Sequence, residues 1–538
     1  MSLEKKYQSW LKEKNMPEDL LVELKKMDET TKKEAFHSDL EFGTGGLRGI
    51  MGAGTSKMNI FTIRRTTQGF ANYLLKIPGA NQKGVAIGYD NRHNSKLFAK
   101  EAAKVLATNG IKVYLFDELR PTPLTSFAVR YYNCAGGIMI TASHNPKEYN
   151  GYKVYNDTGS QLNVKEADLV IEEVNKITDF FNIKAEESNL IIPILEEVEN
   201  NYLENVRKIQ INQTSKNAVI LYSPLHGTGS TILPNFLRSE GYNLFEYEPH
   251  KKVDPNFSNA KVSNPEMPEA WHGMSRYGKE IGADVILLTD PDCDRVGVSV
   301  LHDGDYILLN GNQSAAITVY YLLSQRLANH ILEKDGYVFS TIVTSDLILE
   351  IARHFNQNAE ATLTGFKFIG QRAKEIEGKH KFQFGCEESI GSIISDFVRD
   401  KDGVQSVYNF AEIASYLKDN NLTMIDYLNQ IHQELGYYLE YTHNLVLTGL
   451  EGAEKILNIM SHVRNNPLEL SNLKMLKYDD LKASLTYFPD GSTQSIHLDK
   501  SNVLKYYYEN NIWVVLRPSG TEPKLKIYFS VKSDSQVN

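Results

Sequence analysis

Three aspartates alternate in the segment DPDCDR, which directly follows the apolar run ADVILLT. Three carboxylates spaced two residues apart can turn toward one hard cation, because Mg²⁺ and Ca²⁺ both prefer oxygen ligands. An EF-hand is excluded, because Arg295 and Leu301 stand where that loop needs Gly and Glu. Asp290, Asp292 and Asp294 are therefore candidate ligands of a divalent ion that leave positions open for a phosphate oxygen. A solvated acidic turn is the alternative.

The segment TASHNP places Ser143 beside His144 on a polar turn after the apolar run GGIMI. A Ser–His pair can indicate hydrolysis, but it requires the two side chains within hydrogen-bond reach and a third group that orients the histidine. Neighbouring side chains on an extended segment point apart, and the sequence contains neither a G-x-S-x-G elbow nor an H-E-x-x-H pair. We therefore disfavour a hydrolytic serine. An Asn-Pro turn with incidental Ser and His remains the alternative.

The segment RPSGTEPKLKIY near the C-terminus has the composition of a phosphate cradle. Backbone N–H groups and hydroxyls of a tight turn can bind an anion, and the planar fork of Arg517 can grip it. The turn itself comprises Ser519, Gly520 and Thr521. The spacing of a nucleotide-binding P-loop is absent. An ordinary hairpin loop is the alternative.

Three further segments carry charged or polar side chains that suit a sugar phosphate. FGTGGLRG combines four glycines with Arg48, so its backbone can approach a phosphate that the guanidinium meets. In CEESIGS, Glu387 and Ser389 offer acceptors for sugar hydroxyls, and Lys401 follows in VRDKDG. Taken alone, each segment is more typical of an ordinary surface loop.

The elements around these segments are short apolar runs that alternate with helical stretches such as SKLFAKEAAKVLATNG. This alternation predicts βαβ units and mainly parallel sheets. Three polar segments directly follow apolar runs, in GGIMITASHNP, ADVILLTDPDCDR and KFQFGCEESIGS. In open α/β sheets ligands bind beyond the carboxyl ends of the strands, so these loops stand where a ligand is expected.

A chain of 538 residues exceeds what one hydrophobic core normally supports, so we expect three or four domains. From about Tyr441 onward the pattern changes to that of a small α+β domain with antiparallel pairing. The predicted units are a helical extension over residues 1–40, α/β domains over 41–205, 206–312 and 313–438, and an α+β domain over 439–538.

The composition excludes several classes of function. A net charge of -9 argues against a surface that holds nucleic acid or an anionic membrane. Three scattered cysteines are too few for a disulfide framework or a zinc cluster. The charged N-terminus has no apolar signal region, and no apolar run approaches the ~20 residues of a membrane span. We therefore expect a cytoplasmic protein.

Together these segments resemble the α-D-phosphohexomutases, specifically the long branch of phosphoglucomutases and phosphomannomutases that includes phosphopentomutase-like proteins. The resemblance covers nearly the whole chain, with the motifs in family order: FGTGGLRG, TASHNP, GYK, DPDCDR, TGFKFIG, CEES, RDKDG and RPSGT. It implies four domains around a central cleft. The first three would be topologically similar α/β domains with mixed sheets, and the last an α+β domain.

The resemblance also implies roles for individual residues. Ser143 would be carried as phosphoserine, and one Mg²⁺ per chain would bind Asp290, Asp292, Asp294 and an oxygen of that phosphate. The groups expected at the transferring phosphate are Arg48, Arg295, His144 and Lys153, with Lys153 as the general acid or base. The positions expected to contact the sugar are Lys367, Glu387, Ser389 and Lys401. The loop expected to hold the unreacting phosphate comprises Arg517, Ser519, Gly520 and Thr521. His226, in PLHGTG, would lie on a loop near the cleft.

The function implied is the interconversion of α-D-glucose 1-phosphate and glucose 6-phosphate, with glucose 1,6-bisphosphate as intermediate and activator. Small sugar phosphates would be the ligands, with no nucleic acid or membrane as partner. Phosphopentomutase and phosphomannomutase activities are the alternatives within the family. Cys386, which precedes the Glu pair where many relatives have Gly or an aromatic residue, leaves the sugar open. A metal-dependent sugar phosphatase and a non-catalytic sugar-phosphate-binding protein are the alternatives of other classes.

Overall fold

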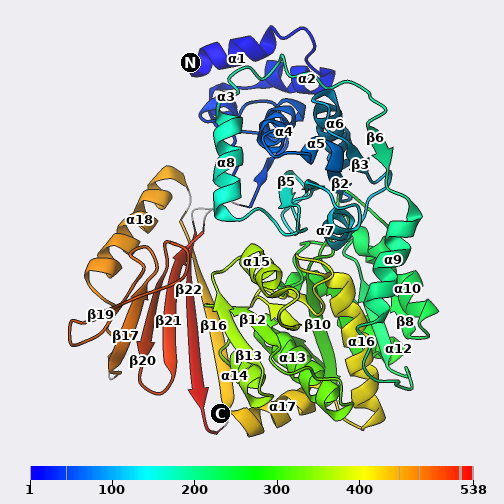
Figure 1. Ribbon diagram of the computed structural model, residues 1–538, viewed down its shortest axis with the longest axis vertical. Coiled ribbons are helices and arrows are strands. Elements are labelled where there is room, and N and C mark those ends of the chain that lie inside the picture. The colour runs from blue at the N-terminus through cyan, green and yellow to red at the C-terminus, as the bar shows by residue number, and fades with distance from the viewer. Residues whose placement is uncertain (1, 44, 448, 472, 520–523, 536–538) are drawn as a thin grey trace.

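The computed structural model describes residues 2–43, 45–447, 449–471, 473–519 and 524–535. These residues form four sheets, and each sheet with its helices makes one domain (Figure 1). The expected fold class is confirmed: three α/β domains with mixed sheets precede an antiparallel α+β domain. No helix in this part of the chain is both long and apolar enough to cross a membrane.

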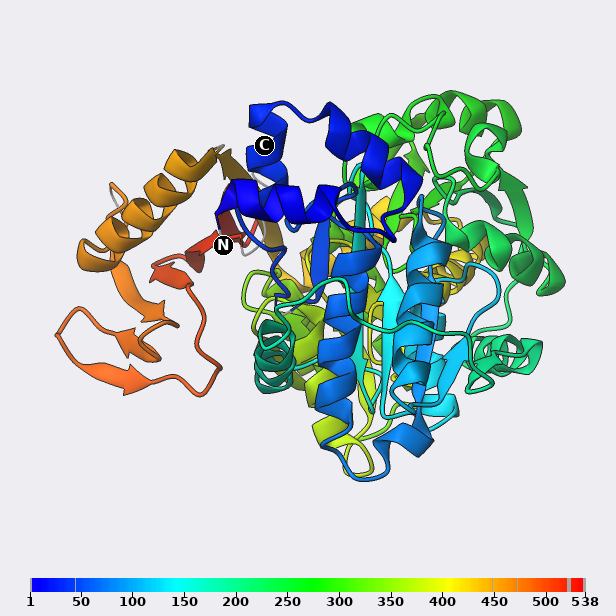
Figure 2. The same ribbon diagram turned by 90° about the horizontal axis from the view of Figure 1, so that it is seen from above.

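Three short helices precede the first sheet and pack on the first domain (Figures 1 and 2). They are α1 (Leu3–Leu11), α2 (Glu18–Lys26) and α3 (Glu29–Phe36). Trp10 of α1 is 2% exposed, and its ring meets those of Phe36, Phe61 and Phe181 edge to face. Aromatic rings packed in this way bury large apolar areas, so the helices belong to the same folded unit as the first domain.

The first domain contains a six-stranded sheet in the order β1-β5-β4-β2-β3-β6. Strands β2, β3, β4 and β6 are parallel, whereas β5 is antiparallel to β4 and β1 is antiparallel to β5. The strands are β1 (Leu47–Ile50), β2 (Val85–Tyr89), β3 (Val113–Leu115), β4 (Gly136–Ile140), β5 (Tyr149–Asn156) and β6 (Ile191–Pro193). The helices around them are α4 (Ile60–Leu74), α5 (Ala80–Lys83), α6 (Ser95–Thr108), α7 (Thr122–Tyr131), α8 (Val164–Asn175) and α9 (Glu196–Arg207).

Both faces of this sheet are buried, which explains the continuous apolar runs of its strands. Ile87 packs in one cluster with side chains of α4, α6 and α8, whereas its neighbour Ala86 packs on the opposite face with α7. The cluster that holds Ala86 continues through Tyr222 of the second domain to Phe339 of the third. The first three domains therefore share one apolar core.

The second and third domains repeat the layout of the first. The sheet of the second domain has the order β11-β10-β9-β7-β8; β7, β8 and β9 are parallel, β10 is antiparallel to β9, and β11 is antiparallel to β10. The sheet of the third domain has the order β13-β12-β14-β15; β12, β13 and β14 are parallel, and β15 is antiparallel to β14. The strands of the second domain are β7 (Val219–Ser223), β8 (Asn243–Glu246), β9 (Val285–Thr289), β10 (Val296–His302) and β11 (Asp305–Leu309), with helices α10 (Leu233–Ser239), α11 (Glu248–Lys251) and α12 (Met274–Ile281). Those of the third are β12 (Tyr337–Thr341), β13 (Asn358–Thr362), β14 (Phe382–Cys386) and β15 (Ser392–Ile393), with α13 (Gly311–Ala328), α14 (Leu347–His354), α15 (Phe366–Ile376), α16 (Gly403–Asp419) and α17 (Met424–Leu435).

One connection recurs in all three domains and carries the polar segments. TASHNP links β4 to β5, DPDCDR links β9 to β10, and EESIG links β14 to β15. In each case a parallel strand ends and the chain turns back into an antiparallel neighbour. The three loops therefore lie at the carboxyl ends of parallel strands, where ligands bind in sheets of this kind.

The fourth domain is a seven-stranded antiparallel sheet in the order β16-β22-β21-β20-β17-β18-β19, with one helix on it. Its elements are β16 (Tyr437–Val446), α18 (Gly449–Asn465), β17 (Met475–Asp480), β18 (Leu485–Tyr487), β19 (Thr493–Ser495), β20 (Leu504–Tyr508), β21 (Ile512–Pro518) and β22 (Lys524–Ser533). It contacts the third domain, where Trp513 Nε1 donates to Asp346 Oδ2 over 2.9 Å and Lys505 Nζ donates to Ile342 O over 2.8 Å.

Candidate active site

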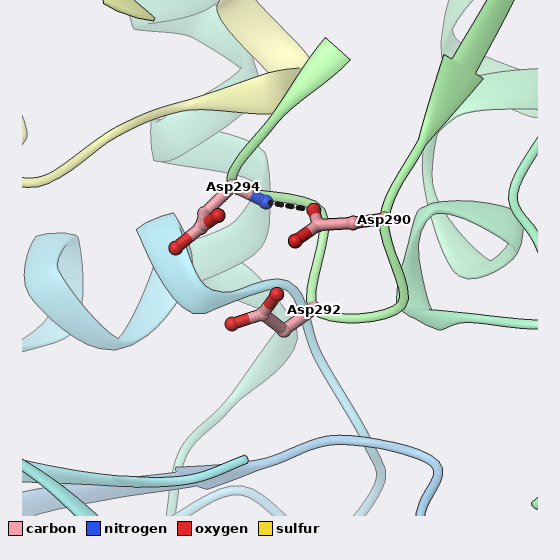
Figure 3. Close-up of side chains that lie close together, drawn as sticks. All are labelled: Asp290, Asp292 and Asp294. Carbon is pink, nitrogen blue, oxygen red and sulfur yellow. Dashed lines mark hydrogen bonds between the residues drawn. The ribbon is translucent and has the colours of Figure 1, made fainter. Parts of the chain in front are cut away.

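The three aspartates of DPDCDR form a buried carboxylate cluster (Figure 3). One oxygen from each of Asp290, Asp292 and Asp294 lies within 4.8 Å of the others. Asp290 Oδ1 accepts the backbone N–H groups of Asp294 and Arg295, each over 3.1 Å. Asp292 Oδ1 and Asp294 Oδ1 are buried and accept no hydrogen bond from the residues described. Buried, unsatisfied carboxylate oxygens at this spacing fit a hard divalent cation such as Mg²⁺.

The turn that brings the aspartates together depends on Cys293. This residue has a φ of 55°, and its N–H donates to Asp290 O over 2.9 Å, which closes the turn. Burial raises the pKa of the Cys293 thiol well above its ordinary value, so the group stays a neutral thiol, a poor ligand for Mg²⁺. Cys293 therefore shapes the loop without joining the carboxylate cluster.

Two lysines lie on the carboxylate cluster. Lys153 Nζ, from β5, is 2.8 Å from Asp292 Oδ2 and 3.0 Å from Asp294 Oδ2. Burial alone lowers the pKa of Lys153, but the two carboxylates outweigh it and hold the pKa above its ordinary value, so the amine is charged. Lys401 Nζ is 3.3 Å from Asp294 Oδ2. Lys401, expected to contact the sugar, thus also lies at the carboxylate cluster.

The hydroxyl of Ser143 reaches the same cluster from the first domain. Its Oγ donates to Asp290 Oδ2 over 2.8 Å and lies 3.3 Å from Nδ1 of His144. The expectation that the two neighbouring side chains point apart is therefore wrong. Ser143 has a φ of 51° rather than an extended conformation, and its N–H is held by Thr141 Oγ1 over 2.8 Å.

This contact does not restore the hydrolytic interpretation. A hydroxyl has one hydrogen, and while that hydrogen is donated to Asp290, His144 Nδ1 can only donate to Ser143 Oγ. A Ser–His base pair needs the opposite direction. Burial, together with Arg295 and Arg48, lowers the pKa of His144 well below its ordinary value, so the ring is neutral.

A cavity of about 1200 Å³ opens onto these groups and is lined by all four domains. Most of the candidate residues among those described line it, namely Arg48, Ser143, His144, Lys153, Asp294, Arg295, Glu387, Ser389, Lys401, Arg517 and Ser519. Lys367 lies on the first turn of α15, next to the lining residue Phe366. Gly520 and Thr521 lie outside the described residues. Segments far apart in the sequence therefore meet at one site.

Two arginines line the cavity together with Ser143 and Asp294. Arg48 lies on β1, where its register with Gly151 of β5 brings it toward the serine loop, and its Nη1 donates to Asn145 Oδ1 over 2.8 Å. Arg295 Nη1 donates to Ser389 O over 3.2 Å and lies 3.6 Å from Glu266 Oε2. Two guanidinium groups beside the serine and the carboxylates can neutralise a phosphoryl group there.

The EESIG loop and the segment that carries Lys367 are joined by a hydrogen bond. Glu387 Oε1 accepts the N–H of Gly365 over 2.8 Å, and Glu387 is 5% exposed. Burial lowers the pKa of Lys367, whose ammonium is 5.2 Å from the centroid of the Phe368 ring. Glu387 and Ser389 thus line the cavity, and Lys367 lies beside it on the first turn of α15.

Cations from the fourth domain line the other end of the cavity. Arg517 is the penultimate residue of β21, and Lys524 and Lys526 lie at the start of the neighbouring strand β22. Ser519 N–H donates to Lys524 O over 2.8 Å, and Arg517 Nη1 donates to the Tyr528 hydroxyl over 3.5 Å. An anion that enters here meets several positive charges, as expected for a phosphate loop.

Three residues near the serine and the carboxylates were missed by sequence reasoning. Thr122 Oγ1 donates to Asp292 Oδ2 over 2.9 Å, and Ser263 Oγ donates to His144 O over 3.0 Å. Arg92 is buried behind the Ser143 loop. Its only sequence signal is its place in the polar segment that follows the apolar run GVAIGY, the same placement that pointed to the other loops.

His226, by contrast, has a structural role. It is 2% exposed, with Nδ1 2.7 Å from Lys252 O, while Nε2 accepts the N–H of Asn259 over 3.3 Å. Since Nε2 is the acceptor, Nδ1 carries the proton and donates to the carbonyl. Both ring nitrogens are used by the backbone of the second domain.

Comparison with known proteins finds relatives of all four domains. The family models of phosphoglucomutase/phosphomannomutase match in order: alpha/beta/alpha domains I, II and III over residues 39–180, 200–304 and 310–434, and the C-terminal domain over 471–538. A phosphoglucomutase of Staphylococcus aureus strain MRSA252 is 37% identical over 97% of this chain and 95% of its own length. One from strain MSSA476 is 38% identical over 93% and 91%.

Solved structures show the same fold. A putative phosphomannomutase from Thermus thermophilus superposes with a TM-score of 0.68 at 22% identity, covering 92% of this chain and 96% of that one. The phosphoglucomutase pp63/parafusin from Paramecium gives 0.67 at 18% identity, with 93% and 92% covered. The chain belongs to the phosphoglucomutase/phosphomannomutase family of phosphohexomutases.

Proposed function

We propose that this protein interconverts α-D-glucose 1-phosphate and glucose 6-phosphate, with Ser143 as the phosphoryl carrier and glucose 1,6-bisphosphate as intermediate. The observation that carries the proposal is the 2.8 Å contact between Ser143 Oγ and Asp290 Oδ2, inside a cavity lined by all four domains. The choice of glucose is supported by the S. aureus phosphoglucomutases, which are 37% and 38% identical to this chain.

A mutase gives a phosphoryl group to one sugar hydroxyl and recovers it from another, so it requires a covalent carrier. In each half-reaction the phosphorus–oxygen bond to Ser143 Oγ breaks while a bond to a sugar oxygen forms, or the reverse. The transferring group spreads its charge over its oxygens, so catalysis depends on positioning and neutralisation. Arg48 and Arg295 supply positive charge, and Lys153 exchanges a proton with the reacting sugar oxygen.

One Mg²⁺ per chain fits between Asp290, Asp292 and Asp294 and would add charge neutralisation at the phosphoryl oxygens. The chain's own groups do the remaining work. We assign Glu387, Ser389, Lys367 and Lys401 to the sugar. We assign Arg517 and Ser519, with Gly520 and Thr521, to the phosphate that does not react. The cavity of about 1200 Å³ leaves room for a bisphosphate to turn end for end.

A side-by-side assay tests the substrate. Glucose 1-phosphate, mannose 1-phosphate and ribose 1-phosphate are each supplied with Mg²⁺ and a trace of the matching bisphosphate, and kcat/KM is compared. We expect glucose 1-phosphate to give the highest value. A pentose or mannose phosphate that exceeds it by a wide margin would overturn the choice of sugar. Inorganic phosphate released in step with substrate loss would instead indicate a phosphatase. Activation by glucose 1,6-bisphosphate and a cytoplasmic location stay predictions.

A further inference from the structure

Residues 90–94, between β2 and α6, contact the loop that carries Ser143. Its central residue, Arg92, has a side chain that is 0% exposed. The two terminal nitrogens of Arg92 make four hydrogen bonds, all to backbone carbonyls of the serine loop and of Tyr149, the first residue of β5. Nη2 donates to Ser143 O over 2.6 Å and Asn145 O over 2.5 Å, and Nη1 donates to Pro146 O over 2.8 Å and Tyr149 O over 3.1 Å.

Only a guanidinium can make this set of contacts. Its two terminal nitrogens carry four N–H groups in a rigid plane, whereas an ammonium has three on one atom. Arg92 is itself fixed from behind, because its Nε lies 3.3 Å from Asp90 Oδ2. Asp90 Oδ1 in turn accepts the N–H of Arg92 over 2.9 Å and the hydroxyl of Ser95 over 2.6 Å. The Phe257 ring lies 5.3 Å from Arg92 Cζ.

The loop needs such support because Ser143 has a φ of 51°, in the left-handed region that residues with a side chain rarely adopt. A conformation of this kind persists only when the surrounding structure fixes it. In this conformation Ser143 Oγ lies 2.8 Å from Asp290 Oδ2. If the loop relaxed, the hydroxyl would lose that position.

The same segment also holds the second domain, which contributes Asp290. Asn91 Nδ2 donates to His226 O over 3.0 Å and to Asp254 O over 3.2 Å, and His93 Nε2 lies 3.0 Å from Asn256 Oδ1. Ser143 and Asp290 belong to different domains. Residues 91–93 therefore bind both the serine loop and the domain that carries the carboxylates.

We propose that Arg92 is a positioning residue for phosphoryl transfer: it fixes Ser143 in the left-handed conformation and holds its hydroxyl against the carboxylate cluster. This inference rests on the proposed function of Ser143 as carrier. The terminal nitrogens of Arg92 donate to backbone carbonyls, and Arg92 is not among the residues that line the cavity, so its loss should slow transfer without weakening the binding of the sugar phosphate.

Two variants test this role. Arg92→Lys keeps the positive charge beside Asp90 but cannot reach four carbonyls. The double variant Asp90→Asn/Arg92→Met removes the guanidinium group without leaving a buried carboxylate unpaired. Arg65→Lys is the matched control, because Arg65 is also buried in the first domain and donates to a backbone carbonyl, that of Ile177, over 3.0 Å. Each protein is assayed with glucose 1-phosphate, phosphorylated by glucose 1,6-bisphosphate in a single turnover, and examined by amide hydrogen exchange.

We expect kcat of both Arg92 variants to fall by about 100-fold, the effect of a displacement of about 1 Å at a reacting group, while KM changes by less than about twofold. Phosphorylation of Ser143 should slow by the same factor. Amide exchange should accelerate in residues 143–149 and not across the rest of the domain. Arg65→Lys should match the wild type throughout.

If Arg92→Lys had the same kcat and the same rate of amide exchange in the serine loop as the wild type, the inference would be overturned. So would a loss of activity accompanied by faster exchange throughout the first domain, because that pattern indicates a general loss of stability. If glucose 1,6-bisphosphate did not phosphorylate Ser143 of the wild type, that result would contradict the proposed function instead. The exchange measurement would still decide whether Arg92 holds the loop.

Discussion

Replacing Lys153 by methionine removes the ammonium group that lies 2.8 Å from Asp292 Oδ2 and 3.0 Å from Asp294 Oδ2. Removing one partner of a buried ion pair costs about 3–5 kcal/mol, because the other charge stays buried and unpaired. Lys401 remains 3.3 Å from Asp294 Oδ2 and still neutralises part of the charge. We therefore expect the free energy of unfolding, measured without divalent metal, to decrease by the lower end of this range, about 3 kcal/mol.

The same change should improve the binding of Mg²⁺. In the wild type a cation that binds the three aspartates must displace the ammonium from two of them. The loss of about 3 kcal/mol of competing interaction corresponds to a decrease of up to about 100-fold in the Kd for Mg²⁺. Catalysis should change in the opposite direction, because loss of a general acid or base lowers kcat by about 10²–10⁴-fold.

Isothermal titration of the metal-free proteins with Mg²⁺, thermal melting with and without EDTA, and kcat at saturating Mg²⁺ measure these effects. Lys100→Met, at an exposed lysine of α6, is the control and should match the wild type in all three. An unchanged Kd for Mg²⁺ in Lys153→Met, with an unchanged melting temperature in EDTA, would refute the view that Lys153 neutralises the carboxylates when no metal is bound.

Two further predictions concern other parts of the cleft. Burial raises the pKa of Glu440, on β16, from 4.5 to about 7, so the native state holds this proton while the unfolded state releases it. The stability contributed by this group is complete below about pH 4.5 and is lost as the pH rises toward about 7. The melting temperature of Glu440→Gln should therefore change less between these two pH values than that of the wild type. Parallel plots of melting temperature against pH would contradict this prediction. Arg517→Met removes a charge-assisted contact worth about 1.5–3 kcal/mol, so KM for glucose 1-phosphate should rise by about 10–100-fold. Steady-state kinetics measure this effect, and an unchanged KM would exclude Arg517 from the phosphate site.

Much of the fold follows from local patterns in the sequence. Continuous apolar runs such as GGIMI and ADVILLT predict buried strands, because both faces of these sheets are covered. The polar loops after them predict the ligand site, because carboxyl ends of parallel strands meet at one edge. The antiparallel strand that follows each loop has no comparable signal. This strand pairs as it does because the chain reverses direction in the loop, and the pattern of apolar residues does not predict that reversal.

The parts of the site that the sequence does not predict depend on backbone conformation and on contacts between domains. The letters TASHNP do not reveal that Ser143 has a left-handed backbone conformation, in which His144 Nδ1 lies 3.3 Å from the hydroxyl. Thr122 and Arg92 act on partners supplied by other segments, and the partners of Arg92 are backbone carbonyls. Lys401 meets Asp294 only because the second and third domains pack together.

The central claim is that Ser143 accepts and returns the phosphoryl group beside the aspartates. Wild-type protein and Ser143→Ala are treated with glucose 1,6-bisphosphate labelled in its phosphoryl groups, and the bound label is mapped by peptide mass spectrometry and then chased with unlabelled glucose 1-phosphate. We predict label on the peptide that contains Ser143, its release into sugar phosphate at the rate of turnover, and neither in Ser143→Ala. Label that maps to another residue, or full turnover by Ser143→Ala, would contradict the account.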